Sequence, residues 1–195
     1  MPAEIIKQLN WIDIFVVISL LRIIYISTKN GMPLEFFKLL GTLLACYLSL
    51  HYYALLVGLF KERLPEIIPL GFFGFLFFII IAVAAYLAVA LLRQIFFKLI
   101  KVEPVPKLNK WAGVIFGGLR GFLLLSLIFF SLVILPLAYP KESVGKSYSG
   151  KFILKIAPLT YNALWNGFAS KFSAKEKFNN TILEIQNSLK PSPQK

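Results

Sequence analysis

The chain is poor in the residues that build most metal centres and cross-links. It has one cysteine, Cys46, and one histidine, His51, among 195 residues. A lone cysteine cannot form a disulfide within the chain or a cysteine metal cluster, and a single histidine excludes multi-histidine sites. Cys46 lies inside an apolar run and is interpreted as a small buried residue. We therefore expect no metal site.

Acidic residues are scarce as well. The chain has nine Asp and Glu residues and 21 Lys and Arg residues, which gives a net charge of +12. A nucleic-acid-binding protein carries such an excess of positive charge on a soluble fold. This chain is too apolar for a soluble fold, with a mean hydropathy of +0.75 and 58% hydrophobic residues. The lysines lie between and after apolar runs, where they meet lipid head groups. We expect the lipid bilayer as a partner and no nucleic acid.

Motifs of catalytic sites are absent too. The sequence has no HExxH, no GxSxG and no aspartate pair of the kind an intramembrane protease uses. His51 has no serine in a motif that would make a catalytic dyad. We expect no catalytic residue and no enzymatic activity.

Four long apolar runs make up most of the chain. A run of about 20 apolar residues is long enough to cross a bilayer as a helix. Asp13 and Arg22 interrupt the first run, but Asp13 and the lack of an A-x-A-like site argue against a cleavable signal peptide. The sequence predicts an all-α polytopic membrane protein with a transmembrane domain over residues 1–138. Its four helices are expected at about residues 11–27, 36–60, 67–92 and 111–135.

The composition changes after this domain. We expect an amphipathic, partly interfacial helical tail over residues 139–190 and a disordered end over 191–195. Lys151–Phe168 mixes lysines with large apolar side chains, is too polar to span and is expected to break at Pro158. It either lies along the lipid head groups or packs under the end of the bundle.

A further helix is expected near the end of the tail. Ser173 and Glu176 have the spacing of a capping box, which marks a helix start. One apolar face of this helix is expected to contain Phe178, Ile182, Ile185 and Leu189.

Small residues recur every four positions in two of the runs. Gly113, Gly117 and Gly121 share one helix face and leave a groove where another backbone can approach closely. A second ridge is formed by Gly41, Ala45 and Ser49. These ridges predict close helix packing, either within the chain or between copies of it.

Charged and polar residues lie inside the predicted helices. Glu35 is a candidate counter-ion of Arg120 or Arg22 in a polar pocket, because an arginine is costly to bury alone. In the alternative, both arginines reach lipid phosphates. Asp13 and His51 lie near the opposite membrane surface, where they form either a proton relay or part of an interfacial polar belt.

Lysine and arginine placement predicts the orientation. Positive residues in short connecting loops favour the cytoplasmic side more strongly than those in a long tail. The 93–110 connection is rich in such residues. We expect this connection inside and both termini in the periplasm.

Three stretches resemble the colicin V production protein (CvpA) family, over roughly Trp11–Pro158. Trp11–Ile12–Asp13 resembles the family's opening WID. Gly31 and Glu35 follow, and then a helix that ends with Ser49, His51, Tyr52 and Tyr53. The most specific match, to LGxxFGxxRG, is formed by Gly113, Phe116, Gly117, Arg120 and Gly121.

The chain departs from this pattern at the first hairpin. Asn30 and Leu34 replace the arginines of the family's RGxxRE, with Arg22 or Lys29 as candidate substitutes, and Asn109 replaces a frequent aspartate. The resemblance implies a four-helix inner-membrane protein of bacteria with no cofactor.

The role implied is that of an accessory in colicin V production or export, or in envelope homeostasis. Its expected partners are itself or other envelope membrane proteins, and no small-molecule substrate is identified. The alternative is a small transporter or channel subunit with a path lined by Arg120.

Overall fold

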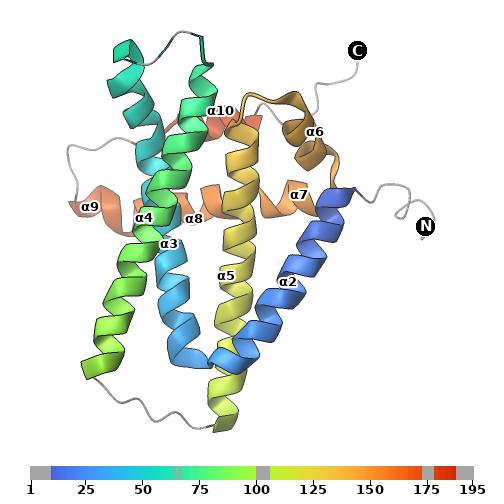
Figure 1. Cartoon of the computed structure of the whole chain (residues 1–195), viewed down its shortest axis with the longest axis vertical. Coiled ribbons are helices and arrows are strands. Elements are labelled where there is room, and N and C mark those ends of the chain that lie inside the picture. Colours follow the sequence, from blue (N-terminus) through green and yellow to red (C-terminus); the bar gives the residue numbers. More distant parts are fainter. Residues whose placement is uncertain (1–9, 64, 66, 100–105, 173–177, 188–195) are drawn as a thin grey trace.

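The computed structural model of the chain describes residues 10–63, 65, 67–99, 106–172 and 178–187 (Figure 1). These residues are mostly helical and contain no strand, which confirms the all-α class. Four helices are long and apolar enough to cross a membrane, as the hydropathy pattern predicts. They are α2 (Trp11–Asn30), α3 (Met32–Phe60), α4 (Leu70–Leu99) and α5 (Pro106–Ile134), and a short 3-10 turn, η1 (Lys61–Arg63), follows α3.

The helix ends differ from the ends of the apolar runs. α3 begins at Met32 instead of residue 36, with Pro33 at a position that suits a helix start. α4 begins at Leu70, directly after Pro69, instead of at residue 67. α4 ends at Leu99, beyond the predicted residue 92. α5 begins at Pro106, before the predicted residue 111. Hydropathy marks the part of a helix that suits lipid, whereas the backbone hydrogen bonds continue through polar residues.

Successive long helices run antiparallel, with α5 between α2 and α3 and with α4 packed along α3 (Figure 1). Only Gly31 separates α2 from α3, and the two helices diverge from it. α5 fills the space between them and is the most buried span, with 61% of its most apolar stretch buried against 17% in α4. α5 is therefore the central helix of the bundle.

The tail crosses the long helices (Figure 1). It contains α6 (Ala138–Lys146), α7 (Tyr148–Ile153), α8 (Ile156–Leu164), a π-helical turn η2 (Trp165–Ala169) and α9 (Ser170–Phe172). α7 packs against α2 and α5, and α8 packs against α3 and α5. The segment therefore lies across the side of the bundle, so packing under the bundle's end, one of the two alternatives, is wrong.

The break in this segment is not at Pro158. The chain turns at Leu154 and Lys155, and Pro158 is the third residue of α8. Proline is tolerated there, because the first N–H groups of a helix have no partner within it.

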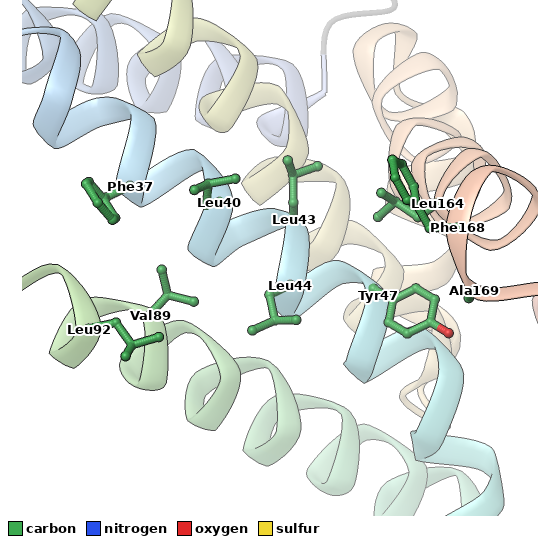
Figure 2. A pocket seen from close by; sticks show the side chains of 10 residues that line it. All are labelled: Phe37, Leu40, Leu43, Leu44, Tyr47, Val89, Leu92, Leu164, Phe168 and Ala169. Atoms are coloured by element: carbon green, nitrogen blue, oxygen red, sulfur yellow. The ribbon is translucent and has the colours of Figure 1, made fainter. Parts of the chain in front are cut away.

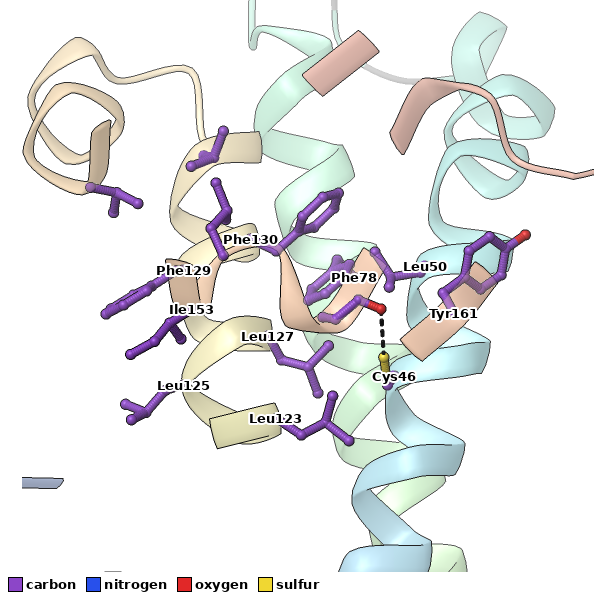
Figure 3. Close-up of a cluster of buried hydrophobic side chains, with 14 of the residues drawn as sticks. Cys46, Leu50, Phe78, Leu123, Leu125, Leu127, Phe129, Phe130, Ile153 and Tyr161 are labelled. Carbon is purple, nitrogen blue, oxygen red and sulfur yellow. Dashed lines mark hydrogen bonds between the residues drawn. The ribbon is translucent and has the colours of Figure 1, made fainter. Parts of the chain in front are cut away.

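Two side chains of the bundle fix the turn between α7 and α8. The hydroxyl of Ser126 on α5 donates to the carbonyl of Leu154 at 3.2 Å and accepts from the N–H of Ala157 at 2.7 Å. The thiol of Cys46 on α3 donates to the carbonyl of Ala157 at 3.4 Å (Figure 3). Around them lies the apolar core, which includes Leu50, Phe78, Phe129, Phe130 and Tyr161. The tail thus forms part of the core.

The last helix begins later in the chain than expected. α10 spans Thr181–Asn187, and Phe178 precedes it instead of belonging to its apolar face. The side-chain oxygen of Asn179 accepts from the N–H of Thr181 at 3.2 Å at the start of the helix. Ser173, Glu176, Leu189 and the end at 191–195 lie outside the described residues.

Candidate functional site

The turn between α2 and α3 depends on two glycines. Gly31 has φ 74°, a backbone conformation that side chains rarely adopt. Gly113 of α5 lies against it, and a Cβ atom at Gly113 would be 3.0 Å from the backbone carbon of Gly31 and from the carbonyl oxygen of Ser27. Asn109, also on α5, accepts from the N–H of Met32 at 2.5 Å and so caps α3. The start of α5 thus holds the turn through backbone contacts.

The next two glycines of the ladder face α2. A Cβ atom at Gly117 would collide with the side chain of Ser27 and would lie 3.3 Å from a carboxylate oxygen of Glu35. A Cβ atom at Gly121 would lie 3.2 Å from Leu20 and 3.3 Å from Ile23. Gly113, Gly117 and Gly121 therefore line one contact between helices of the same chain.

Glu35 is the centre of a buried charged cluster beside this ladder. Its side chain is 0% exposed. The Nε of Arg120 donates to Oε2 at 3.0 Å, while the Nζ of Lys38 at 3.0 Å and the Nδ2 of Asn30 at 2.5 Å donate to Oε1. Both carboxylate oxygens are thus bonded to groups of the chain itself, as a buried carboxylate requires.

The two candidate arginines lie in different surroundings. Arg120 is 8% exposed and faces Glu35, whereas Arg22 is exposed on α2. Neither Arg22 nor Lys29 is among the residues that bond to Glu35. Sequence reasoning missed Lys38 in this role, although its spacing of three residues from Glu35 places the two on one helix face.

The second ridge of small residues lies on α3. A Cβ atom at Gly41 would lie 3.2 Å from the ring of Tyr86 and 3.5 Å from Val89, both on α4. Ala45 and Ser49 are buried, and the Ser49 hydroxyl donates to the carbonyl of Cys46 at 3.4 Å. Gly41 therefore lies at the α3–α4 contact.

Asp13 joins the start of α2 to α7. Its Oδ1 accepts from the hydroxyl of Ser147 at 2.8 Å and from the N–H and hydroxyl of Ser149 at 2.8 and 2.5 Å. Its Oδ2 accepts from the N–H of Asn10 at 3.0 Å. Sequence reasoning missed these serines, because they lie more than 130 residues away in the chain.

His51 lies in a separate cluster at α8 and η2. Its Nδ1 lies 2.8 Å from the hydroxyl of Tyr161, and its ring stacks between Tyr47 and Trp165. Asp13 bonds to Ser149 of α7, whereas His51 contacts Tyr161 of α8 and Trp165 of η2. The two groups of the relay hypothesis thus have different partners.

These clusters are built of internal hydrogen bonds and ion pairs. Among the residues that the structure describes, no three His, Cys, Asp or Glu side chains are grouped to hold a metal ion. The carboxylate oxygens of Glu35 and Asp13 already accept hydrogen bonds from groups of the chain. These bonds hold the helices in position relative to one another.

A family model matches most of the chain. Residues 12–158 match the model described as "Colicin V production protein". This range agrees with the stretch over which the sequence shows its resemblance. No curated protein and no solved structure matches the chain.

Proposed function

This chain belongs to the colicin V production protein family, and from that membership we propose that it is an accessory protein of the bacterial inner membrane without enzymatic activity. It supports colicin V production or export, or envelope homeostasis more broadly, by contacting itself or other envelope membrane proteins. Four helices that suit a membrane support its place in the bilayer. Both termini lie in the periplasm in this proposal, because the 93–110 connection is rich in positive charge.

The observation that carries the accessory role is the complete internal bonding of Glu35. A charged group on a transport path must exchange its partners with water or with the substrate. Glu35 is 0% exposed and bonds to Arg120, Lys38 and Asn30, so its bonds instead hold α5 and α2 to α3. This favours a fixed assembly unit over a conducting path.

The site residues have packing roles in this proposal. Gly113, Gly117 and Gly121 allow α5 to approach α2, and Gly41, Ala45 and Ser49 form the corresponding ridge on α3. The polar residues tie separate elements together: Glu35 and Arg120 join α3 to α5, Asp13 joins α2 to α7, and His51 joins α3 to α8. The exposed Arg22 is left to meet lipid head groups.

The transmembrane domain at 1–138 and the tail at 139–190 act as one unit. Ser126 and Cys46 of the long helices bond to the turn between α7 and α8. A tail with hydrogen bonds to the core cannot move independently of the bundle without losing them.

The proposal is tested by crosslinking in the membrane with mass spectrometry and by a flux assay in liposomes. We expect reproducible crosslinks to a second copy or to a defined envelope protein, and no ion flux above that of empty liposomes. Flux that Arg120→Ala abolishes and that Arg22→Ala leaves unchanged would establish the transporter instead. Arg22 is a suitable control because it is an exposed arginine on a neighbouring span.

A further inference from the structure

An apolar groove lies between α3, α4 and the end of the crossing tail (Figure 2). Its volume is ≈ 550 Å³, within the roughly 300–1,000 Å³ typical of ligand sites. Apart from the hydroxyl of Tyr47, its walls are hydrocarbon. They are formed by Phe37, Leu40, Leu43, Leu44 and Tyr47 of α3, Val89 and Leu92 of α4, and Leu164, Phe168 and Ala169 of the tail.

The groove has the length of one membrane leaflet. Phe37 and Leu92 lie at one end, and Tyr47 and Ala169 lie at the other (Figure 2). From Phe37 to Tyr47, a helix rises about 15 Å at 1.5 Å per residue. This is half of the roughly 30 Å hydrocarbon core of a bilayer. The groove therefore matches an acyl chain lying along one leaflet.

Positive charge lies at the end marked by Leu92. The continuous apolar stretch of α4 ends at Leu92, and Arg93 follows it. Arg93 is four residues beyond Val89 and so lies on the same helix face as that lining residue. Within the described part of the chain, Arg93 forms no ion pair with a carboxylate, whereas Lys38 is paired with Glu35.

The other end of the groove is lined by the tail. Leu164, Phe168 and Ala169 come from α8 and the π-helical turn and lie beside Tyr47. Phe168 is 67% exposed and Leu92 is 62% exposed, so both present uncovered hydrocarbon surface to an occupant. A site with an apolar end beside the tail and a cation at its other end is complementary to a molecule with an anionic head and a hydrocarbon chain.

We propose that this groove binds one acyl chain of an anionic phospholipid of the surrounding bilayer. The phosphate lies at Arg93, and the end of the acyl chain lies against Leu164 and Phe168. This site goes beyond the accessory role and depends only on the four helices being in a membrane. Basic residues beside a groove between membrane helices select anionic lipids by charge, while the apolar walls hold the chain.

The test uses the full chain reconstituted in nanodiscs that contain a trace of phosphatidylglycerol with a diazirine at the end of one acyl chain. After photolysis, labelled peptides are located by mass spectrometry. We expect label on the segment that contains Leu164–Ala169, above the label on the lipid-facing side of α2. The same diazirine on phosphatidylcholine is the matched lipid control and should label that segment less.

Neighbouring residues provide matched variants. Leu92→Trp fills the groove and should remove the label, whereas Leu91→Trp alters a similarly exposed residue outside the lining and should not. Arg93→Gln should lower labelling about fivefold, as expected for one basic residue near an anionic lipid. Arg63→Gln, an exposed arginine at the other end of the α3–α4 hairpin, should not. Equal thermal unfolding midpoints for all four variants exclude misfolding, and Arg93→Gln tests the site without altering its apolar walls.

Several results would overturn the proposal. Equal labelling by both lipids, unaffected by Leu92→Trp, would mean ordinary annular lipid only. Label from the chain-end probe beside Arg93 would mean that the lipid lies in the reverse direction. Crosslinks from the groove to a second copy, in place of lipid label, would mean that a protein occupies it.

Discussion

At the scale of single residues, close helix packing in this protein depends on glycines, because they have no Cβ atom. Gly117 and Gly118 are adjacent in α5, yet a Cβ atom at Gly117 would collide with Ser27 and one at Gly118 would meet nothing within 4 Å. The four-residue spacing of the ladder includes Gly117 and excludes Gly118. The contact of Gly117 with Ser27 is the structural reason for this difference. Only the glycine that faces α2 is needed for close approach.

This difference gives a matched pair of substitutions. Gly117→Ala should lower the stability of the protein by about 1–3 kcal/mol, because the added methyl group overpacks the α2–α5 contact. Gly118→Ala should cause no loss, since alanine favours the helix over glycine by about 1 kcal/mol. Thermal unfolding in detergent measures both. Equal losses in the two variants would show that the contact with Ser27 is unimportant.

The ion pair of Glu35 and Arg120 predicts a second residue-scale result. Glu35→Gln should destabilise the protein by about 3–5 kcal/mol, because it leaves the buried Arg120 without its carboxylate. Arg120→Met should destabilise it less, because Lys38 and Asn30 still bond to Glu35. The double variant should lose less than the sum of the two single losses. Arg22→Met is the control and should change little, because Arg22 is exposed. Strictly additive losses in a double-mutant cycle would contradict the pairing.

At the scale of elements, the tail and the bundle share hydrogen bonds. The turn at Leu154 leaves backbone groups of α7 and α8 that regular helix bonds do not satisfy, and Ser126 of α5 meets two of them. Ser131 lies on the same helix and is also buried, but its hydroxyl bonds to Ile128 within α5. The two serines have the same chemistry and different structural roles.

We expect Ser126→Ala to destabilise the protein by about 1–3 kcal/mol, because the carbonyl of Leu154 and the N–H of Ala157 lose their buried partner. It should also speed cleavage by trypsin at Lys151 and Lys155, since α7 and α8 are held less firmly. Ser131→Ala should stay within about 0.5 kcal/mol of the wild type. A loss as large for Ser131→Ala as for Ser126→Ala would mean that the turn does not depend on this hydroxyl.

At the scale of the whole molecule, the four antiparallel spans place the start of α2 and the end of α5 on the same side of the bundle (Figure 1). The α3–α4 connection at η1 lies on that side too, and the start of α5 lies on the other. Charge then decides which side faces the cytoplasm, because positive residues in short connections are retained inside. The native cysteine does not interfere with labelling experiments, because Cys46 is 0% exposed.

Cysteine labelling in intact cells measures this orientation. Glu62→Cys, in the exposed η1 turn, should react with a membrane-impermeant maleimide from outside. Lys110→Cys, near the start of α5, should react only after the membrane is permeabilised. Wild-type protein should remain unlabelled throughout. The opposite pattern would reverse the proposed topology.

The sequence by itself determined the helical class, the number of spans and the family. These depend on local quantities: the length of each apolar run, its hydropathy, and short motifs such as Trp11–Ile12–Asp13. The helix ends were less predictable, because α4 continues through Arg93 and Lys98 although its apolar run stops before them. Hydropathy reports the surroundings of a residue and does not report its backbone hydrogen bonds.

Only the tertiary structure decided which polar groups meet. Glu35 had two candidate arginines in the sequence, and the packing of Gly113 and Gly117 on the α2–α3 turn brings Arg120 to it instead of Arg22. The partners of Asp13 at Ser147 and Ser149 and the course of the tail across α3 and α5 depend on the same packing. Contacts between residues far apart in the chain, such as the 85 positions between Glu35 and Arg120, are set by how helix surfaces fit together, and no periodicity within one helix records them.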